Sequence, residues 1–269
     1  MRLVPTPLRP LALACLLLSC AAAAVPPRGA DPGTLRVVTY NILAGDRGLK
    51  GIIETLKTAD ADLIALQEVD RLTKRSGKTD QPGKLAAALK MNVFYAPFFP
   101  YQGGEFGVAL LSRYPIVRAA RVKVKGSRLS QLDATVRTPG GDVHVIVVHF
   151  TVTFPFRDQK ETDACDAARL GEAKAASALA TATKGPTLVL GDMNDDSGSP
   201  PYEVFAKSLQ DSCEVKGGGM AKTWNSAFPI TRIDYLWASP HFVVQSCETI
   251  ASQASDHLPV LAELSFAPR

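Results

Sequence analysis

The sequence lacks the features that identify several common classes of protein at once. No apolar run reaches the roughly 20 residues that a membrane-spanning helix needs. The zinc-helix motif, the Walker A loop, the G-x-S-x-G elbow and the G-x-G-x-x-G fingerprint are all absent. Neither sign of charge is in large excess, since the net charge is +4 over 269 residues. The sequence therefore gives no sign of a P-loop enzyme or an elbow-type serine hydrolase, and its charge does not indicate a nucleic-acid partner.

Residues 1–33 differ from the rest and are expected to be an export leader followed by a tether rich in Ala, Pro and Gly. Arg2 and Arg9 give a positive start, and an apolar run, LALACLLL, follows at 11–18. Small residues after that run are typical of a cleavage site. We therefore expect an exported protein.

The tetrapeptide at 17–20, LLSC, resembles a bacterial lipoprotein box. This resemblance implies cleavage before Cys20, lipidation of its thiol and a tether to the membrane. The alternative is ordinary secretion with cleavage within 21–24, which would leave a periplasmic or secreted protein.

Cysteine is scarce in the mature chain, where Cys165, Cys213 and Cys247 remain. Their spacing fits no zinc pattern. Export permits a disulfide, and Cys213 and Cys247 are the preferred pair because each lies near a short strand-like run. The alternative is that all three thiols are small buried apolar groups.

Residues 34–269 are expected to form one α/β domain, which we expect to be a monomer without a protein partner. The chain is 46% hydrophobic and 21% charged, as globular proteins are. Helical spacing predicts helices at 49–59 and 158–183. Apolar runs of strand character lie at 35–42, 62–69, 106–112, 143–150, 187–192 and 233–239. Buried strands with interspersed helices predict a layered architecture.

Polar side chains recur at the ends of these apolar runs. They are Asn41, Glu68, His149, Asp192, Asn194, Asp234, Asp256 and His257. Each has an ordinary explanation alone, because an Asp or Asn at a strand end usually forms a turn and a His there is usually structural. Ligand sites, however, gather at strand ends in α/β sheets, so we expect one pocket to hold all of these groups.

This set of side chains suits the cleavage of phosphate esters. Hard cations such as Mg²⁺ prefer carboxylate and carbonyl oxygens. A bound metal polarises a phosphoryl oxygen and lowers the pKa of an attacking water. A carboxylate or imidazole can accept the proton of that water, while another protonates the leaving oxygen.

Seven segments resemble, in order, the endonuclease/exonuclease/phosphatase superfamily, to which deoxyribonuclease I belongs. They are TYNI (39–42), ALQEVD (65–70), GVALLSRYPI (107–116), VVHF (147–150), LVLGDMND (188–195), RIDYLW (232–237) and SDHLPV (255–260). ALQEVD, GDMN and SDH together make the resemblance specific. It implies a four-layer α/β sandwich of two packed mixed β-sheets flanked by helices, and a Mg²⁺ or Mn²⁺ ion.

The resemblance also implies roles on the metal side of the site. Glu68 matches the main metal ligand, with Asn41 beside it and Asp256 as a further metal-linked acid. Asp192 matches the residue that activates or orients the attacking water. Asn194 would orient that water or a phosphate oxygen.

On the acid–base side, His257 would bind the scissile phosphate or act as a general base, with Asp234 orienting it. His149 matches the imidazole that protonates the leaving group, and Glu105 is a candidate for orienting it. Arg169 lies where related sequences often carry a basic residue. A position on a helix surface is favoured over a phosphate contact for this arginine.

A calcium-binding loop is a rival interpretation of one segment. Asp192, Asn194, Asp196 and Glu203 fall at positions 1, 3, 5 and 12, as in an EF-hand. Position 6, however, is Ser197 instead of glycine, and the preceding run is strand-like. A second rival is a catalytically inactive member of the family that only binds, although every core catalytic position is filled.

The sequence leaves several classes of phosphate ester as candidate substrates. A phosphodiesterase or nuclease-like enzyme is favoured, and a phosphatase or phospholipase C-type enzyme on lipid or sugar phosphates is the alternative. A nuclease typically carries a basic stripe, whereas Lys and Arg are dispersed here apart from groups at 71–78 and 118–128. An aromatic stretch at 95–102, expected in a loop, suits contact with phospholipid, stacking on nucleic-acid bases or packing at the edge of the core.

Overall fold

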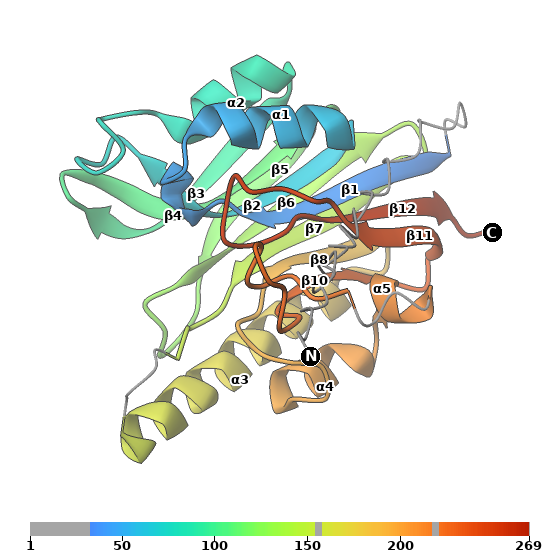
Figure 1. The fold of residues 1–269 in the computed structure, drawn as a ribbon. Helices are drawn as coiled ribbons and strands as arrows, with labels where there is room; N and C mark the ends of the chain where they lie inside the picture. The colour runs from blue at the N-terminus through green and yellow to red at the C-terminus, as the bar shows by residue number, and fades with distance from the viewer. Residues whose placement is uncertain (1–32, 154–157, 217–220, 269) are drawn as a thin grey trace, which may run out of the picture.

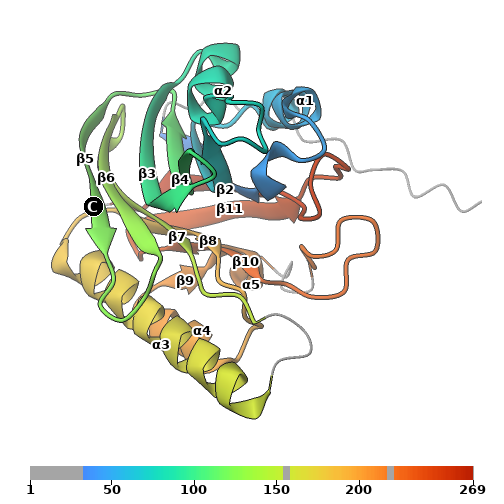
Figure 2. The same cartoon turned by 90° about the vertical axis from the view of Figure 1, so that its left-hand side faces the viewer.

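The computed structural model of the protein describes residues 33–153, 158–216 and 221–268. Two six-stranded sheets lie face to face, with helices on both outer sides (Figures 1 and 2). The predicted four-layer sandwich is therefore confirmed. The predicted leader and the lipidated Cys20 lie outside the described residues. No helix within the described residues is both long and apolar enough to cross a membrane.

The first sheet has the strand order β11-β12-β1-β2-β4-β3. Its strands are β1 (Thr34–Asn41), β2 (Leu63–Arg71), β3 (Asn92–Tyr101), β4 (Gly104–Ser112), β11 (Phe242–Thr249) and β12 (Val260–Phe266). β1 and β2 are parallel, and the other neighbours are antiparallel. The helices α1 (Leu49–Ala59) and α2 (Gln81–Leu89) cover the outer face of this sheet (Figure 2).

The second sheet has the strand order β5-β6-β7-β8-β10-β9. Its strands are β5 (Ile116–Lys123), β6 (Ser130–Thr138), β7 (Gly141–His149), β8 (Thr187–Asp192), β9 (Gln210–Asp211) and β10 (Asp234–Ala238). Only β7 and β8 pair in parallel. The helices α3 (Gln159–Ala182) and α4 (Pro200–Ala206) cover its outer face. The short elements η1 (Leu43–Gly45) and α5 (Ser212–Val215) lie at the ends of strands.

The core explains why the central strands read as nearly continuous apolar runs. Both faces of each sheet are covered, one by the other sheet and one by helices, so successive side chains on both faces are buried. On β7, Val145 and Val147 face the other sheet, whereas Ile146 and Val148 pack against the helical layer. This leaves strand ends as the places where polar groups can gather.

The aromatic stretch at 95–102 forms most of β3, so the loop expected there is wrong. β3 is the edge strand of its sheet, and an edge strand tolerates Pro97 and Pro100 because one side of its backbone needs no partner. The register shifts beside Pro97. Phe98 is buried in the core between the sheets, and Phe99 packs against it. The aromatic rings of this strand are thus part of the packing.

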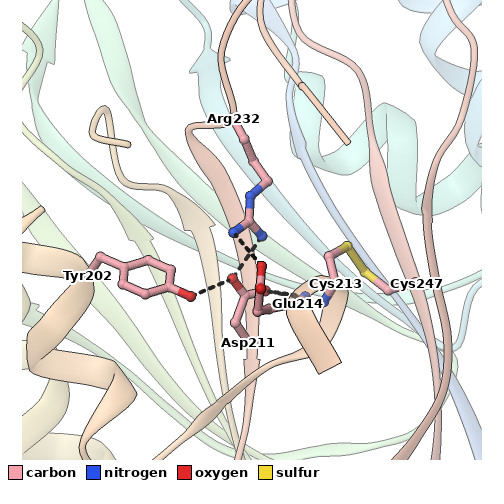
Figure 3. Close-up of a disulfide and its surroundings, with 6 residues drawn as sticks. All are labelled: Tyr202, Asp211, Cys213, Glu214, Arg232 and Cys247. Atoms are coloured by element: carbon pink, nitrogen blue, oxygen red, sulfur yellow. Dashed lines mark hydrogen bonds and ion pairs between the residues drawn. A yellow bond between two sulfur atoms is a disulfide. The ribbon is translucent and has the colours of Figure 1, made fainter. Parts of the chain in front are cut away.

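A disulfide joins Cys213 and Cys247, with their Cα atoms 4.9 Å apart, which confirms the preferred pair (Figure 3). Cys213 is on α5, which contacts β9 and β10 of the second sheet, whereas Cys247 is on β11 of the first. The bond therefore links the edges of the two sheets covalently. Cys165 remains a free thiol on α3.

Candidate active site

Three neighbouring strands of the second sheet place their polar end residues in one row. His149 lies opposite Asp192 on the parallel strands β7 and β8. Asp192 lies opposite Asp234 on the antiparallel strands β8 and β10. Because β10 runs the other way, its first residue meets the last residues of its neighbours. The pattern of polar residues at strand ends therefore corresponds to one edge of this sheet.

The first sheet contributes Asn41 and Glu68 at the corresponding ends of β1 and β2. Asn41, the last residue of β1, lies opposite Gln67 on β2. The register of β2 against β4 shifts between Leu66 and Val69, and Glu68 has a φ of 55° within this irregularity. A bulge of this kind redirects a side chain out of the regular alternation of the strand.

The loop before β12 brings Asp256 and His257 to the same place. β12 is antiparallel to β1, so the residues that precede it lie beside the end of β1. Ser255 Oγ donates a hydrogen bond of 2.7 Å to the backbone oxygen of Asn41, and it also lies 3.3 Å from Asp256 Oδ1. The other carboxylate oxygen of Asp256 accepts from Trp224 Nε1 at 3.3 Å.

Asn41 joins the two halves of the site. Its side-chain nitrogen donates to Glu68 Oε1 at 3.2 Å and to Asp192 Oδ2 at 2.9 Å. Its side-chain oxygen accepts from the backbone N–H of Leu43 at 3.1 Å. Asn41 is 1% exposed, so this hydrogen bonding is shielded from water. In this arrangement, the nitrogen of Asn41, and not its oxygen, faces the carboxylates.

Both imidazoles flank the same carboxylate oxygen. Asp192 Oδ2 lies 3.7 Å from His149 Nε2 and 3.8 Å from His257 Nε2. The other ring nitrogen of His257, Nδ1, lies 2.8 Å from Asp234 Oδ2, which fixes the orientation of the ring. The ring nitrogen Nδ1 of His149 is buried and has no hydrogen-bond partner among the described residues.

The charges of the acidic residues influence the protonation of His257 and Asp192. Burial alone would lower the pKa of His257, but the charges of Asp234 and Asp192 and the hydrogen bond with Asp234 outweigh it and raise the pKa to about 10. Burial, together with the negative charge of Asp234, raises the pKa of Asp192 above its ordinary value. His257 is therefore an imidazolium at neutral pH and donates from Nδ1 to Asp234.

Two places offer oxygen ligands for a cation. Asp192, Asp234 and His257 form a buried cluster whose candidate ligand atoms lie within 4.8 Å of one another. In that cluster, however, His257 Nδ1 is hydrogen-bonded to Asp234 Oδ2, so neither of these two atoms is free to bind an ion. Glu68 is half-buried and borders a cavity of about 390 Å³, so it can meet a cation that keeps its waters. The donor set around Glu68 therefore fits a hydrated hard metal ion.

Asn194 holds the loop that follows β8. Its backbone N–H donates to Asp192 Oδ1 at 2.9 Å, and its side-chain nitrogen donates to the backbone oxygen of Phe150 at 2.9 Å. The segments after His149 and after Asp192 are thus fixed to each other. In the segment of the rival calcium-loop interpretation, Asp196 accepts from Thr231, and Glu203 lies on α4. These side chains serve separate contacts, and the calcium-loop interpretation is not supported.

The prediction that Glu105 orients His149 is wrong. Glu105 on β4 lies directly opposite Arg71 on β2, and the two side chains form an ion pair. The register between β2 and β4 selects this partner, and a motif in one segment of sequence cannot reveal it.

The surface position favoured for Arg169 is also wrong, because this side chain is 7% exposed. Its Nε lies 3.0 Å from Asp195 Oδ2, and its Nη1 donates to the backbone oxygen of Thr151 at 3.0 Å and to Thr153 Oγ1 at 2.7 Å. Arg169 therefore ties the loops after β7 and β8 to α3. It supports the loops that follow His149 and Asp192.

A second buried arginine anchors the start of β10, two residues before Asp234. Arg232 Nη1 lies 2.7 Å from Asp211 Oδ2, and its guanidinium stacks 4.7 Å from the ring centre of Tyr235. Asp211 also accepts from the hydroxyl of Tyr202 at 3.2 Å and from the backbone of Cys213 at 3.1 Å (Figure 3). The disulfide and the start of β10 are thus connected through Asp211.

Sequence reasoning missed several residues that support the site. Ser255 and Trp224 contact Asp256, and Thr223 Oγ1 accepts from the backbone N–H of Asp234 at 3.2 Å. Ser255 is adjacent to the Asp256-His257 pair and could have been found from that position. Trp224 lies 32 residues from Asp256, and Thr223 lies 11 residues from Asp234; no local pattern marks either of them.

A four-layer α/β sandwich with polar side chains from six strand ends and loops at one edge defines the class of fold. The sequence matches the model of the endonuclease/exonuclease/phosphatase family over residues 38–257, and the chain belongs to this family. The resemblance seen in the sequence motifs is therefore confirmed.

Solved structures of low sequence identity share the fold. An endonuclease/exonuclease/phosphatase from Beutenbergia cavernae aligns with a TM-score of 0.66 and 22% identity over 87% of this chain and 72% of that one. The catalytic domain of human nocturnin with bound sulfate aligns at 0.65 and 22% over 87% and 94%. A mannosyl-6-phosphatase from Bacteroides thetaiotaomicron aligns at 0.63 and 20% over 86% and 100%. Comparison with curated protein sequences gives no match.

Proposed function

We propose that the protein is a divalent-metal-dependent hydrolase of phosphate esters. Members of its family are phosphoesterases or nucleases. The observation that carries the proposal is the position of Asp192 Oδ2, which meets the Asn41 amide and both imidazoles at one point. Buried acid–base groups held this closely are typical of a site for proton transfer.

Glu68 is the proposed principal ligand of Mg²⁺ or Mn²⁺, and Asp256 is the proposed second acid near it. Asn41 would hold Glu68 in place through its amide nitrogen. When bound, such an ion polarises the phosphoryl group and makes a water molecule more acidic.

The remaining roles are those of the buried residues Asp192, His257 and His149. Asp192 orients the attacking water and accepts its proton, for which its raised pKa suits it. His257, charged and held by Asp234, donates from Nε2 to a phosphate oxygen and stabilises negative charge. His149 supplies the proton to the leaving oxygen.

The charge distribution favours small phosphate esters over long nucleic acids. Three arginines around the site are engaged in ion pairs, Arg75 with Asp70, Arg169 with Asp195, and Arg232 with Asp211, whereas Arg47 donates to backbone oxygens of the loop before Asp256. A guanidinium that is already paired contributes little to neutralising a polyanion. This observation favours the phosphatase branch, on sugar or lipid phosphates, over the nuclease branch.

We also propose that the protein is exported, anchored through Cys20 or released by cleavage. The apolar run at 11–18 supports export, as does the disulfide, since disulfides persist in oxidising compartments. Replacement of Cys20 by Ala should abolish fatty-acid labelling of the protein in its host; equal labelling of both forms would contradict the anchor.

A panel of phosphate esters tests the main proposal. Protein that lacks the leader would be assayed on bis-p-nitrophenyl phosphate, p-nitrophenyl phosphate, sugar phosphates and DNA, each with Mg²⁺, Mn²⁺ or EDTA. We expect turnover with either metal and none with EDTA. The proposal fails if no ester is cleaved, and its metal requirement fails if EDTA leaves the rate unchanged.

A further inference from the structure

A cavity of about 390 Å³ lies beside Glu68, outside the group formed by Asp192 and the imidazoles. This size is at the lower end of small-molecule sites, which enclose roughly 300–1,000 Å³. One wall comes from the turn after β1 and the start of α1, and the other from the loop between β2 and α2. We call it the Glu68 cavity.

The floor of the Glu68 cavity is fixed by Gln81. Its side-chain nitrogen donates to the backbone oxygen of Ala44 at 2.5 Å, and its oxygen accepts from the backbone N–H of Asp70 at 2.9 Å. Gln81 is 2% exposed, so both walls are tied together from beneath. At Gly45 a Cβ would stand 2.8 Å from the Gln81 nitrogen, and the φ of Gly45 is +67°. The cavity is therefore built into the fold.

Arg75 is held rigidly at the edge of this cavity. Its Nε and one terminal nitrogen bond the two oxygens of Asp70 at 2.7 and 2.9 Å. Its guanidinium lies 4.7 Å from the ring centre of Tyr101 and 5.2 Å from that of Phe106. The second terminal nitrogen, Nη1, has no hydrogen bond to any residue within the described ranges. An immobilised donor of this kind loses little entropy when it binds a ligand.

Two further polar groups of the lining are free to bind. The carboxylate of Asp46 and the hydroxyl of Thr79 line the cavity, and neither makes a hydrogen bond within the part of the chain that the structure describes. The cavity thus presents a donor from Arg75, an acceptor from Asp46 and a hydroxyl that serves as either. Leu43 and Leu49 add apolar surface beside them.

The composition of the lining selects among possible occupants. The lining holds the carboxylates of Asp46 and Glu68, and its single guanidinium, that of Arg75, is already paired with the buried Asp70, which disfavours a second phosphate group. No described residue that lines the cavity is aromatic, so a nucleobase would find no ring to stack on. A neutral group rich in hydroxyls matches both the donors and the acceptors.

We propose that the Glu68 cavity binds the polyol part of a sugar or polyol phosphate, whose phosphate lies between Glu68 and Asp192. This inference rests on the proposed function and narrows it to one class of substrate. In the reaction, an oxygen–phosphorus bond forms to water while the bond from phosphorus to the sugar oxygen breaks. The sugar leaves as an alcohol after taking up a proton, and inorganic phosphate remains.

The test compares Thr79→Val and Asp46→Asn with the unaltered enzyme on hexose 6-phosphates and on p-nitrophenyl phosphate. The hydrogen bond lost in Thr79→Val weakens binding by about 1 kcal/mol, and so does the exchange of a charged acceptor for a neutral one in Asp46→Asn. The ratio of kcat/KM for the sugar phosphate to that for p-nitrophenyl phosphate should therefore fall about fivefold in each variant, through KM. Both positions are at least partly exposed, so both variants should fold.

Thr181→Val and Asp142→Asn, which change the same residue types far from the cavity, are the matched controls and should leave that ratio unchanged. An unchanged ratio in both cavity variants overturns the inference. So does an enzyme that cleaves bis-p-nitrophenyl phosphate but no sugar or polyol phosphate, although the proposed function then stands. An enzyme that cleaves none of these esters overturns both.

Discussion

The two halves of the site are built differently. In the second sheet, His149, Asp192 and Asp234 form a row across three paired strands, and each is at most 8% exposed. In the first sheet, Glu68 leaves a bulge, is half-buried and borders an open cavity. The buried half suits proton transfer, because charges interact strongly away from water. The open half suits a hydrated ion and a substrate, both of which must enter and leave.

Removing the centre of the buried half should have the largest effect. Asp192→Ala deletes the carboxylate between the two imidazoles, and His257→Ala deletes its charged partner. Each should lower turnover about a hundredfold or more, as losses of positioned acid–base groups do. Steady-state kinetics on p-nitrophenyl phosphate measure this loss. Asp142→Ala, near the far end of β7, should keep its rate; near-normal rates in folded Asp192 and His257 variants would refute these roles.

Breaking the covalent link between the sheets should affect stability instead of chemistry. The disulfide closes a segment with a sequence separation of 34 residues, and its loss in Cys213→Ser/Cys247→Ser should lower the free energy of unfolding by about 2–3 kcal/mol. Urea denaturation measures this change, with Cys165→Ser as the control. Because neither half of the site contains these sulfurs, kcat should change by less than about twofold. A large loss of kcat at full folding would show that the link also positions the site.

The open half should determine the response to metal. Glu68→Gln removes the charge of the proposed ligand, so the Mg²⁺ concentration for half-maximal rate should rise about tenfold or more. Asp234→Asn alters the buried half, so it should lower kcat at saturating Mg²⁺ while shifting that concentration less. Metal titrations of both variants make the comparison. If Asp234→Asn shifts the metal response more than Glu68→Gln does, the ion belongs to the buried cluster.

The smallest effect is expected at Arg169, which supports the buried half from behind. Arg169→Lys keeps the charge but cannot reach Asp195, Thr151 and Thr153 together, so the loops after β7 and β8 should loosen. We expect kcat to fall about threefold with KM nearly unchanged. Arg137→Lys, at an exposed ion pair, is the control. Equal rates for the two variants would show that the loops hold without this support.

The central strands, and the position of polar residues together at their ends, could be predicted from the sequence. Paired apolar strands that end in polar residues have few ways to pack, and the row of His149, Asp192 and Asp234 follows from their pairing. The helices predicted at 49–59 and 158–183 also agree with α1 and α3. These features depend on local pattern, which a sequence displays directly.

Features that depend on partners across the fold could not be predicted. The ion pair of Glu105 follows from strand register, and the burial of Arg169 follows from the loops it meets. The strand at 92–101 was missed because its prolines argue against a strand unless its position at a sheet edge is known. No helix was predicted at 81–89, although Pro82 and the capping side chain of Asp80 mark its start.

The backbone of Glu68 is in a conformation of higher energy than this residue type normally adopts. A φ of 55° is a conformation that glycine and asparagine adopt readily and that costs most other residues about 1 kcal/mol. An asparagine there would let the protein fold at least as well, yet it would carry no negative charge. The glutamate is therefore a compromise in which the molecule gives up some conformational ease and places an acid at the edge of the Glu68 cavity.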